Sequence, residues 1–118
     1  MVRDMEQTVE SKSFQFSVRI VQLCKHLMNT KKEFVLSKQL LRSGTSVGAN
    51  IAEAQQAQSR ADFLSKLCIS LKEASETDYW LRLLKATDYL TDVEFDSIIR
   101  DCREIERMLT AIVKTTKQ

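Results

Sequence analysis

Apolar residues recur along this chain at steps of three and four, the spacing that places side chains on one face of an α-helix. A first helix is predicted from about Ser13 to Asn29. Its apolar stripe consists of Phe16, Ile20, Val21, Leu23, Cys24, Leu27 and Met28. Near the other end of the chain a strict four-three alternation is typical of a bundle seam, formed by Phe95, Ile98, Cys102, Ile105, Leu109 and Ile112.

The starts of the other helices are predicted from capping signatures. In such a signature a Ser or Thr hydroxyl accepts from a first-turn N–H, and an acidic residue follows three positions later. The chain has three of them: Thr30 with Glu33, Ser59 with Asp62, and Thr91 with Glu94. The second helix is therefore expected to begin at Thr30, the third at Ser59 and the fourth at Thr91.

The middle of the second helix is ambiguous from residue 43 to residue 50. The stretch Ser43-Gly44-Thr45-Ser46 has the composition of a turn. Gly44, Gly48 and Ala52, however, are four apart and would form a flat stripe along a continuous helix. Each interior glycine costs about 1 kcal/mol relative to alanine, a cost that close approach of another helix backbone would offset. The periodicity favours the continuous helix over the turn.

Four long amphipathic segments joined by short loops predict an all-α protein, an up-down-up-down four-helix bundle. The absence of proline and the presence of only two glycines support this fold class. A β domain of similar size would need many turn-forming residues. Residues 1–118 are expected to form one domain, with residues 1–10 and 115–118 as loose tails.

Positive charge is unevenly distributed along the chain, although the formal net charge is only +2. Residues 11–43 carry seven Lys or Arg against one acid, Glu33, whereas residues 44–118 carry ten against twelve. A basic strip formed by Arg19, Lys25, Lys38 and Arg42 is a possible polyanion contact. The alternative is a solvated face of long side chains.

No pattern of catalytic or ligand-binding residues is found. The sole histidine, His26, lacks a Glu three residues before it, and it faces away from Cys24 on a helix. Gly44 and Gly48 do not form a phosphate-binding loop. The three cysteines, widely spaced, are expected to be small core residues in a reducing cytosol. We therefore expect no enzyme, no cofactor and no metal site.

No apolar run is long enough to span a membrane. The first ten residues contain no apolar segment of the kind found in signal peptides. A cytoplasmic protein without membrane contact is expected.

The segment from residue 39 to residue 54, QLLRSGTSVGANIAEA, resembles the signature of the bacterial four helix bundle protein family. This family is also called the 23S ribosomal RNA intervening-sequence protein family. Its pattern is approximately Gln-Leu-x-Arg-Ala/Ser-x-x-Ser-x-x-x-Asn-Ile-Ala-Glu. The segments 59–63 and 71–81 also resemble the family, and the resemblance covers roughly residues 13–113.

The resemblance implies a left-handed bundle whose signature helix continues through Gly44 and Gly48, and assembly into a homopentameric ring. Some relatives are encoded inside rRNA intervening sequences. A more distant relative is the accessory protein of diversity-generating retroelements, which works with a reverse transcriptase and nucleic acid through a basic exterior. The chain departs from the family pattern in two places: 29–32 replaces a usual Phe-Pro, and Ala54 replaces a common glycine.

Four signature side chains, Arg42, Ser46, Asn50 and Glu53, could be structural or functional. We favour hydrogen bonds across helix or subunit contacts for Ser46, Asn50 and Glu53, because an acid is a poor phosphate ligand. Arg42 either pairs with a carboxylate, such as Glu53 of a neighbouring subunit, or joins the basic strip.

Trp80 and Tyr79 could stack on bases, but a tryptophan beside Leu81 and Leu84 is more typical of a core or a subunit interface.

Two functions follow from this sequence. The first is a non-enzymatic oligomeric accessory protein that binds RNA or a ribonucleoprotein through basic helices 1 and 2. The alternative is an interaction scaffold for an acidic protein partner. The charge distribution favours both and does not separate them.

Overall fold

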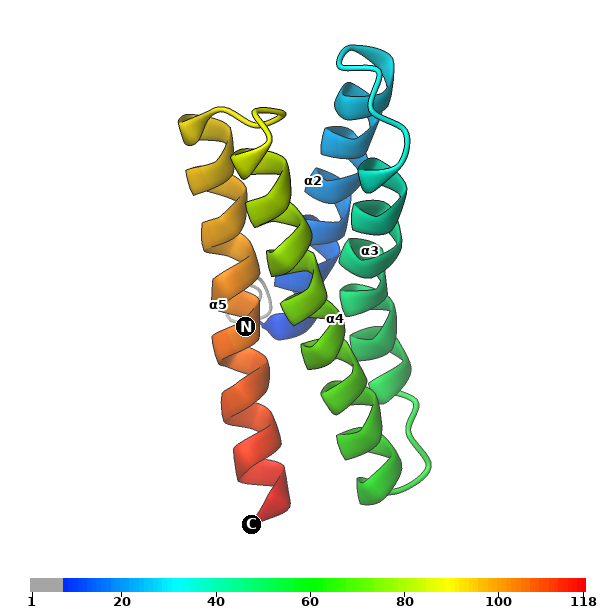
Figure 1. The fold of residues 1–118 in the computed structure, drawn as a ribbon. Coiled ribbons are helices and arrows are strands. Elements are labelled where there is room, and N and C mark those ends of the chain that lie inside the picture. The colour runs from blue at the N-terminus through cyan, green and yellow to red at the C-terminus, as the bar shows by residue number, and fades with distance from the viewer. Residues whose placement is uncertain (1–7) are drawn as a thin grey trace.

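The computed structural model describes residues 8–118, which contain four α-helices and no strand. The helices are α2 (Val9–Asn29), α3 (Leu36–Ala54), α4 (Arg60–Ala86) and α5 (Asp92–Lys117). They run alternately up and down, and each packs against the next in the chain, while α2 also contacts α5 (Figure 1). The predicted all-α four-helix bundle is confirmed, and its handedness remains a prediction.

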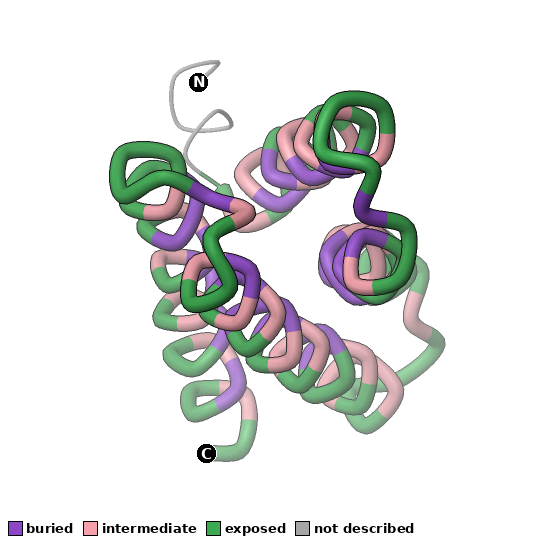
Figure 2. The backbone as a smooth tube through the Cα atoms, turned by 45° about the horizontal axis from the view of Figure 1, so that its top comes forward, coloured by how far each residue is buried: buried purple, intermediate pink, exposed green. Residues whose placement is uncertain are grey.

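The apolar stripes of all four helices face one shared core (Figure 2). Its largest fully buried side chains are Phe16, Ile20, Leu27, Leu40, Val47, Ile51, Leu67, Thr77, Leu81, Leu84, Ile105 and Leu109. Within the predicted seam of α5, residues 98, 102, 105 and 109 are buried and the two end positions are partly buried. The four-three spacing therefore identified the inner face of this helix correctly.

Both ends of the described chain contain more helix than the sequence suggested. Thr8 caps α2 by accepting from the Ser11 N–H at 3.2 Å, so Val9 and Glu10 are helical rather than part of a loose tail. At the other end α5 continues to Lys117. Arg60 of α4 donates to the carbonyl oxygens of Thr116 and Gln118 there. The rest of the predicted N-terminal tail, residues 1–7, lies outside the described residues.

The predicted start of the second helix at Thr30 is wrong. Thr30 instead closes α2, with its N–H donating to the His26 carbonyl. Glu33 is buried and caps α3 directly, because its carboxylate accepts from the N–H groups of Val35, Leu36 and Ser37 at 2.7–3.1 Å. Burial alone would raise the pKa of Glu33, but these hydrogen bonds lower it below its ordinary value. The capping signatures at Ser59 and Thr91 are both confirmed.

The helix α3 continues without interruption through both glycines, as the periodicity favoured. A Cβ atom at Gly44 would lie 2.8 Å from Cγ2 of Ile20 on α2. A Cβ at Gly48 would lie 3.2 Å from the backbone oxygen of Ser13 and 3.1 Å from the Ser17 hydroxyl. The two glycines therefore let α2 approach α3 more closely than any larger residue would permit.

Replacing Gly44 by alanine is expected to destabilise the protein by about 1–3 kcal/mol, because Ile20 is fully buried and cannot move aside. The better helix propensity of alanine, about 1 kcal/mol, offsets part of the steric cost. Urea unfolding followed by circular dichroism measures the difference. Ala111→Gly, at an exposed position inside α5, serves as the propensity control. An unchanged or raised stability of Gly44→Ala would show that the contact is loose.

Candidate functional site

The charged signature residues lie along the contact between α3 and α4. The Arg42 guanidinium donates to Glu73 at 3.2 Å and also to Glu76, both on α4 of the same chain. Glu53, three turns further along α3, accepts from Lys66 of α4 at 2.9 Å. The carboxylates that pair with Arg42 thus come from α4 rather than from Glu53 of a neighbouring subunit.

The polar signature residues Ser46 and Asn50 bond to each other on α3. The Asn50 amide donates to the Ser46 carbonyl at 2.8 Å and lies 3.4 Å from its hydroxyl. Two buried hydroxyls of α4 also form hydrogen bonds with α3. Ser70 donates to the Val47 carbonyl at 2.7 Å, and Thr77 donates to the Ser43 hydroxyl at 2.9 Å. The bonds of Ser70 and Thr77 fix α4 against α3, whereas the bonds between Asn50 and Ser46 lie within α3, unlike the cross-helix bonds expected for these two residues.

The predicted basic strip is broken up by ion pairs. Arg19 donates to Asp101 of α5 at 2.5 Å, and Arg42 is held by α4. Lys25 and Lys38 are exposed, and neither forms an ion pair with any residue from 8 to 118. The sequence reasoning counted charges along the chain and could not detect acids supplied by distant helices.

The positive charge on α2 and α3 that has no ion-pair partner among residues 8–118 is concentrated at the loop that joins the two helices, residues 30–35, and on the adjacent helix ends. We call this region the hairpin tip, and its members are Lys25, Lys31, Lys32, Phe34 and Lys38. All five are exposed, and Phe34 is 51% accessible. The nearby carboxylate of Glu33 is occupied by backbone N–H groups, so it offers no ion pair to these lysines in the described structure.

A second cluster of charged groups lies between α4 and α5. The buried carboxylate of Asp78 accepts from Nε of Arg82 at 2.8 Å and from Nε of Arg103 at 3.0 Å. Burial would raise the pKa of Asp78, but these arginines and a hydrogen bond with Glu106 lower it. Burial and the adjacent Asp78 raise the pKa of Glu106 to about 7. The two carboxyl groups therefore share a proton near neutral pH.

Asp78, Glu106 and Cys102 place three potential metal-ligating atoms within 4.8 Å of one another. Both Asp78 oxygens already accept from guanidinium groups, and burial raises the pKa of the Cys102 thiol. The arrangement is that of a compensated buried ion pair rather than of a ligand set awaiting a cation.

The cysteines do not all lie in the core. Cys24 and Cys102 are buried as predicted, and burial raises the pKa of Cys24 to about 12. Cys68 is exposed, contrary to the expectation for this residue. It lies on the outer side of α4.

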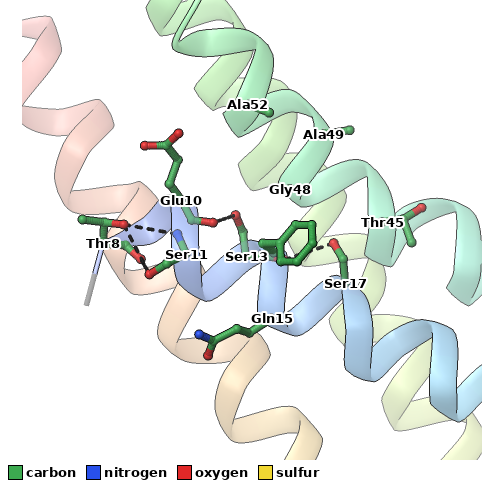
Figure 3. Close-up of a pocket in the computed structure, with 11 residues that line it drawn as sticks. Thr8, Glu10, Ser11, Ser13, Gln15, Ser17, Thr45, Gly48, Ala49 and Ala52 are labelled. Atoms are coloured by element: carbon green, nitrogen blue, oxygen red, sulfur yellow. Dashed lines mark hydrogen bonds between the residues drawn. The ribbon is translucent and has the colours of Figure 1, made fainter. Parts of the chain in front are cut away.

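A groove of about 710 Å³ runs between α2 and α3 on the outer side of the bundle (Figure 3). Small residues, Gly48, Ala49 and Ala52, form its α3 wall. The hydroxyls of Ser13 and Ser17 donate to backbone carbonyls of their own helix at 3.0 Å, so they leave little polar surface in the groove. Phe14 lies at the groove with 70% of its surface exposed.

The sequence profile of the 23S rRNA-intervening sequence protein family matches residues 5–111. The chain belongs to this family. Similarity to a solved structure extends over most of the chain: a protein of unknown function from the S23 ribosomal protein family of Bacteroides thetaiotaomicron VPI-5482 is 60% identical. The match covers 91% of this chain and 99% of that chain, with a TM-score of 0.90. No match is found among curated proteins.

The family assignment confirms the resemblance that was drawn from the signature segment. Neither the 23S rRNA-intervening sequence family nor the solved relative is described by a catalytic activity. No helix within residues 8–118 combines the length and apolar character needed to cross a membrane.

The carboxyl pair between α4 and α5 makes the stability of this family member depend on pH. The folded-state pKa of Glu106, about 7, lies above the ordinary value of 4.5, so the folded state binds the proton more tightly. The contribution of Glu106 to the free energy of unfolding therefore falls as the pH rises from about 4.5 to about 7, and it is constant above that.

Glu106→Gln is expected to remove this dependence, so that the variant gains stability relative to the wild type across the same interval. Thermal unfolding at a series of pH values measures the difference between the two proteins. Asp96→Asn, at an exposed position of α5 that forms no ion pair with any residue from 8 to 118, gives the background for loss of one carboxylate. A constant difference between Glu106→Gln and wild type would contradict the shared proton.

Proposed function

We propose that this protein is a non-enzymatic, self-assembling accessory protein that binds RNA through the hairpin tip of α2 and α3. The observation that carries the proposal is a group of four exposed lysines in and beside the loop that carries the exposed Phe34, none of which forms an ion pair with any residue from 8 to 118. Positive charge that the protein does not neutralise itself is available to phosphates. An exposed aromatic ring beside it can stack on a base.

The geometry of the tip favours a flexible single strand or loop over a buried ligand. Val35, next to Phe34, is 72% exposed, so two apolar side chains project beside the lysines. Lys32 has a positive φ of 57°, which turns the chain sharply between the two helices. The ribosomal names of the family and of its solved relative agree with an RNA partner.

Removing three lysines in Lys25→Gln/Lys31→Gln/Lys38→Gln is expected to weaken RNA binding at low salt by at least tenfold. The slope of log affinity against log salt should become shallower by about 2, because each lost phosphate contact contributes about 0.7 for a single strand. Fluorescence anisotropy with a labelled single-stranded RNA measures both quantities.

The matched control removes three ion-paired basic residues from the same helices, Lys12→Gln/Arg19→Gln/Arg42→Gln. It changes the net charge equally but leaves the hairpin tip intact, so it should bind RNA more tightly than the tip variant. An equal loss of RNA affinity in the two triple variants would contradict a binding site at the hairpin tip. Absence of RNA binding by the wild type at low salt, with capture of an acidic protein instead, would favour the interaction scaffold.

Self-assembly is proposed through the groove between α2 and α3. An exposed large side chain, Phe14, and a hollow lined by Gly48, Ala49 and Ala52 lie on one patch of the surface. With an exposed aromatic side chain beside a hollow on the same surface, Phe14 of one copy can pack into the groove of another copy of the chain. The family resemblance leads us to expect five copies in a ring.

Phe14→Ser is expected to lower the oligomeric state, because it deletes the largest exposed apolar group of the groove without touching the core. Light scattering after size exclusion measures the mass of the assembly. Val93→Ser, at a residue 79% exposed on α5 and outside the groove, is the matched control. An unchanged mass for Phe14→Ser, or a monomeric wild type, would contradict assembly through this surface.

A further inference from the structure

The outer face of α5 carries a row of basic residues. The near balance of basic and acidic residues over residues 44–118 concealed this row. Arg100, Arg103, Arg107, Lys114 and Lys117 recur at steps of three, four and seven, which places them on one face of the helix. All five are exposed. We call this row the α5 stripe.

Most acids of α5 do not neutralise the α5 stripe, because they are used elsewhere in the bundle; the exposed Asp96, one turn before Arg100 on the same face, forms no ion pair with any residue from 8 to 118. Asp101 pairs with Arg19 of α2 at 2.5 Å, and Glu104 pairs with Lys12 of α2 at 3.1 Å. Within residues 8–118, Arg103 is the one member of the stripe that forms an ion pair. The fold therefore separates the charges of a helix whose composition is nearly balanced.

The buried Asp78 holds two guanidinium groups at the edge of this stripe. Both Arg82 and Arg103 use Nε to donate to Asp78, at 2.8 and 3.0 Å. Among the described residues, none accepts from the terminal Nη atoms of either arginine. A guanidinium held through Nε keeps its outer donors for a phosphate, and its orientation is fixed in advance.

A shallow groove of about 510 Å³ lies beside these arginines. Its basic walls come from Arg103, Arg107 and Lys114, with Thr110 between them and with Asp78 and Glu106 at its inner side. The groove thus combines cations, a hydroxyl and an oriented guanidinium on one face of the bundle.

We propose that the α5 stripe, together with Arg82, is a second phosphate-binding surface that takes the sugar-phosphate backbone of single-stranded RNA. This inference rests on the proposed function for the identity of the ligand, but it concerns a different face of the molecule. The hairpin tip lies at one end of α2 and α3, whereas the stripe follows α5 towards its C-terminal end (Figure 1).

The dimensions of the α5 stripe favour a continuous polyanion over the scattered acids of a protein partner. From Arg100 to Lys117 the helix rises about 25 Å at 1.5 Å per residue. Its cations follow one another at steps of three, four and seven residues along one face of this straight helix, and a nucleic acid strand carries one negative charge per nucleotide along its whole length. The ring of Tyr79, with Arg82 5.7 Å from its centre, adds a half-exposed aromatic at the same edge.

The test uses three variants of the full chain and a labelled single-stranded RNA of about 20 nucleotides, longer than a typical single-strand site. The stripe variant is Arg100→Gln/Arg107→Gln/Lys114→Gln, which removes three exposed residues that form no ion pair with residues 8–118 and should leave the fold intact. The tip variant is Lys25→Gln/Lys31→Gln/Lys38→Gln, and the third variant combines all six changes. Circular dichroism checks the folding of each.

The stripe variant is expected to bind RNA at least tenfold more weakly than the wild type at low salt, with a salt slope shallower by about 2. The tip variant should retain residual salt-dependent RNA binding, and the variant with all six changes should lose it. Crosslinking of RNA to the wild type followed by peptide mapping should place contacts in residues 100–117.

The outcomes separate the two proposals. A stripe variant that binds as the wild type does would overturn the α5 surface and leave the proposed function standing. A tip variant that binds normally beside a weakened stripe variant would overturn the hairpin tip alone. Failure of the wild type to bind RNA would overturn both, and binding only to an acidic peptide or an anionic vesicle would reassign the stripe to that class of partner.

Discussion

The close approach of α2 to α3 at Gly44 and Gly48 sets the geometry of the bundle. The nearest Ile20 carbon is 2.8 Å from where a Cβ at Gly44 would be, and the Ser13 carbonyl oxygen is 3.2 Å from where a Cβ at Gly48 would be. Two interior glycines weaken a helix, so the tight contact has to compensate for that loss. It does so by burying Ile20, Val47 and Ile51 completely. The same approach leaves the outer groove beside Gly48, so one packing feature shapes both the core and a surface.

Charge pairing between helices has a second consequence, because it decides which positive charges stay available. The acids of α5 hold Arg19 and Lys12 of α2, and the acids of α4 hold Arg42 of α3. Each exposed pair contributes only about 0–1 kcal/mol to stability. Their larger effect is on the surface potential, since they leave the hairpin tip and the α5 stripe as two faces where cations without ion pairs gather among residues 8–118.

Buried polar groups in this bundle are satisfied within the described residues, and this limits the chemistry that they can perform. Asp78 is held by two arginines, Glu33 by three backbone N–H groups, and Ser70 and Thr77 by groups of α3. Such groups fix the register of the helices rather than activate a substrate. Glu106 is the exception in its electrostatics, since its pKa near 7 makes the contact between α4 and α5 sensitive to pH.

Local and periodic features were predictable from the sequence alone. Apolar spacing predicted four helices and the inner face of α5, and the caps at Ser59 and Thr91 predicted two helix starts, because both features depend on residues within a turn or two of one another. The signature segment identified the family. The capping prediction failed at Thr30, since the Glu33 carboxylate accepts from the N–H groups that follow it.

Only the tertiary structure could pair Arg42 with α4 and Arg19 with α5, or reveal the α5 stripe. Those outcomes depend on which helices lie side by side, and ion pairs between residues more than 30 positions apart leave no periodic trace in the chain.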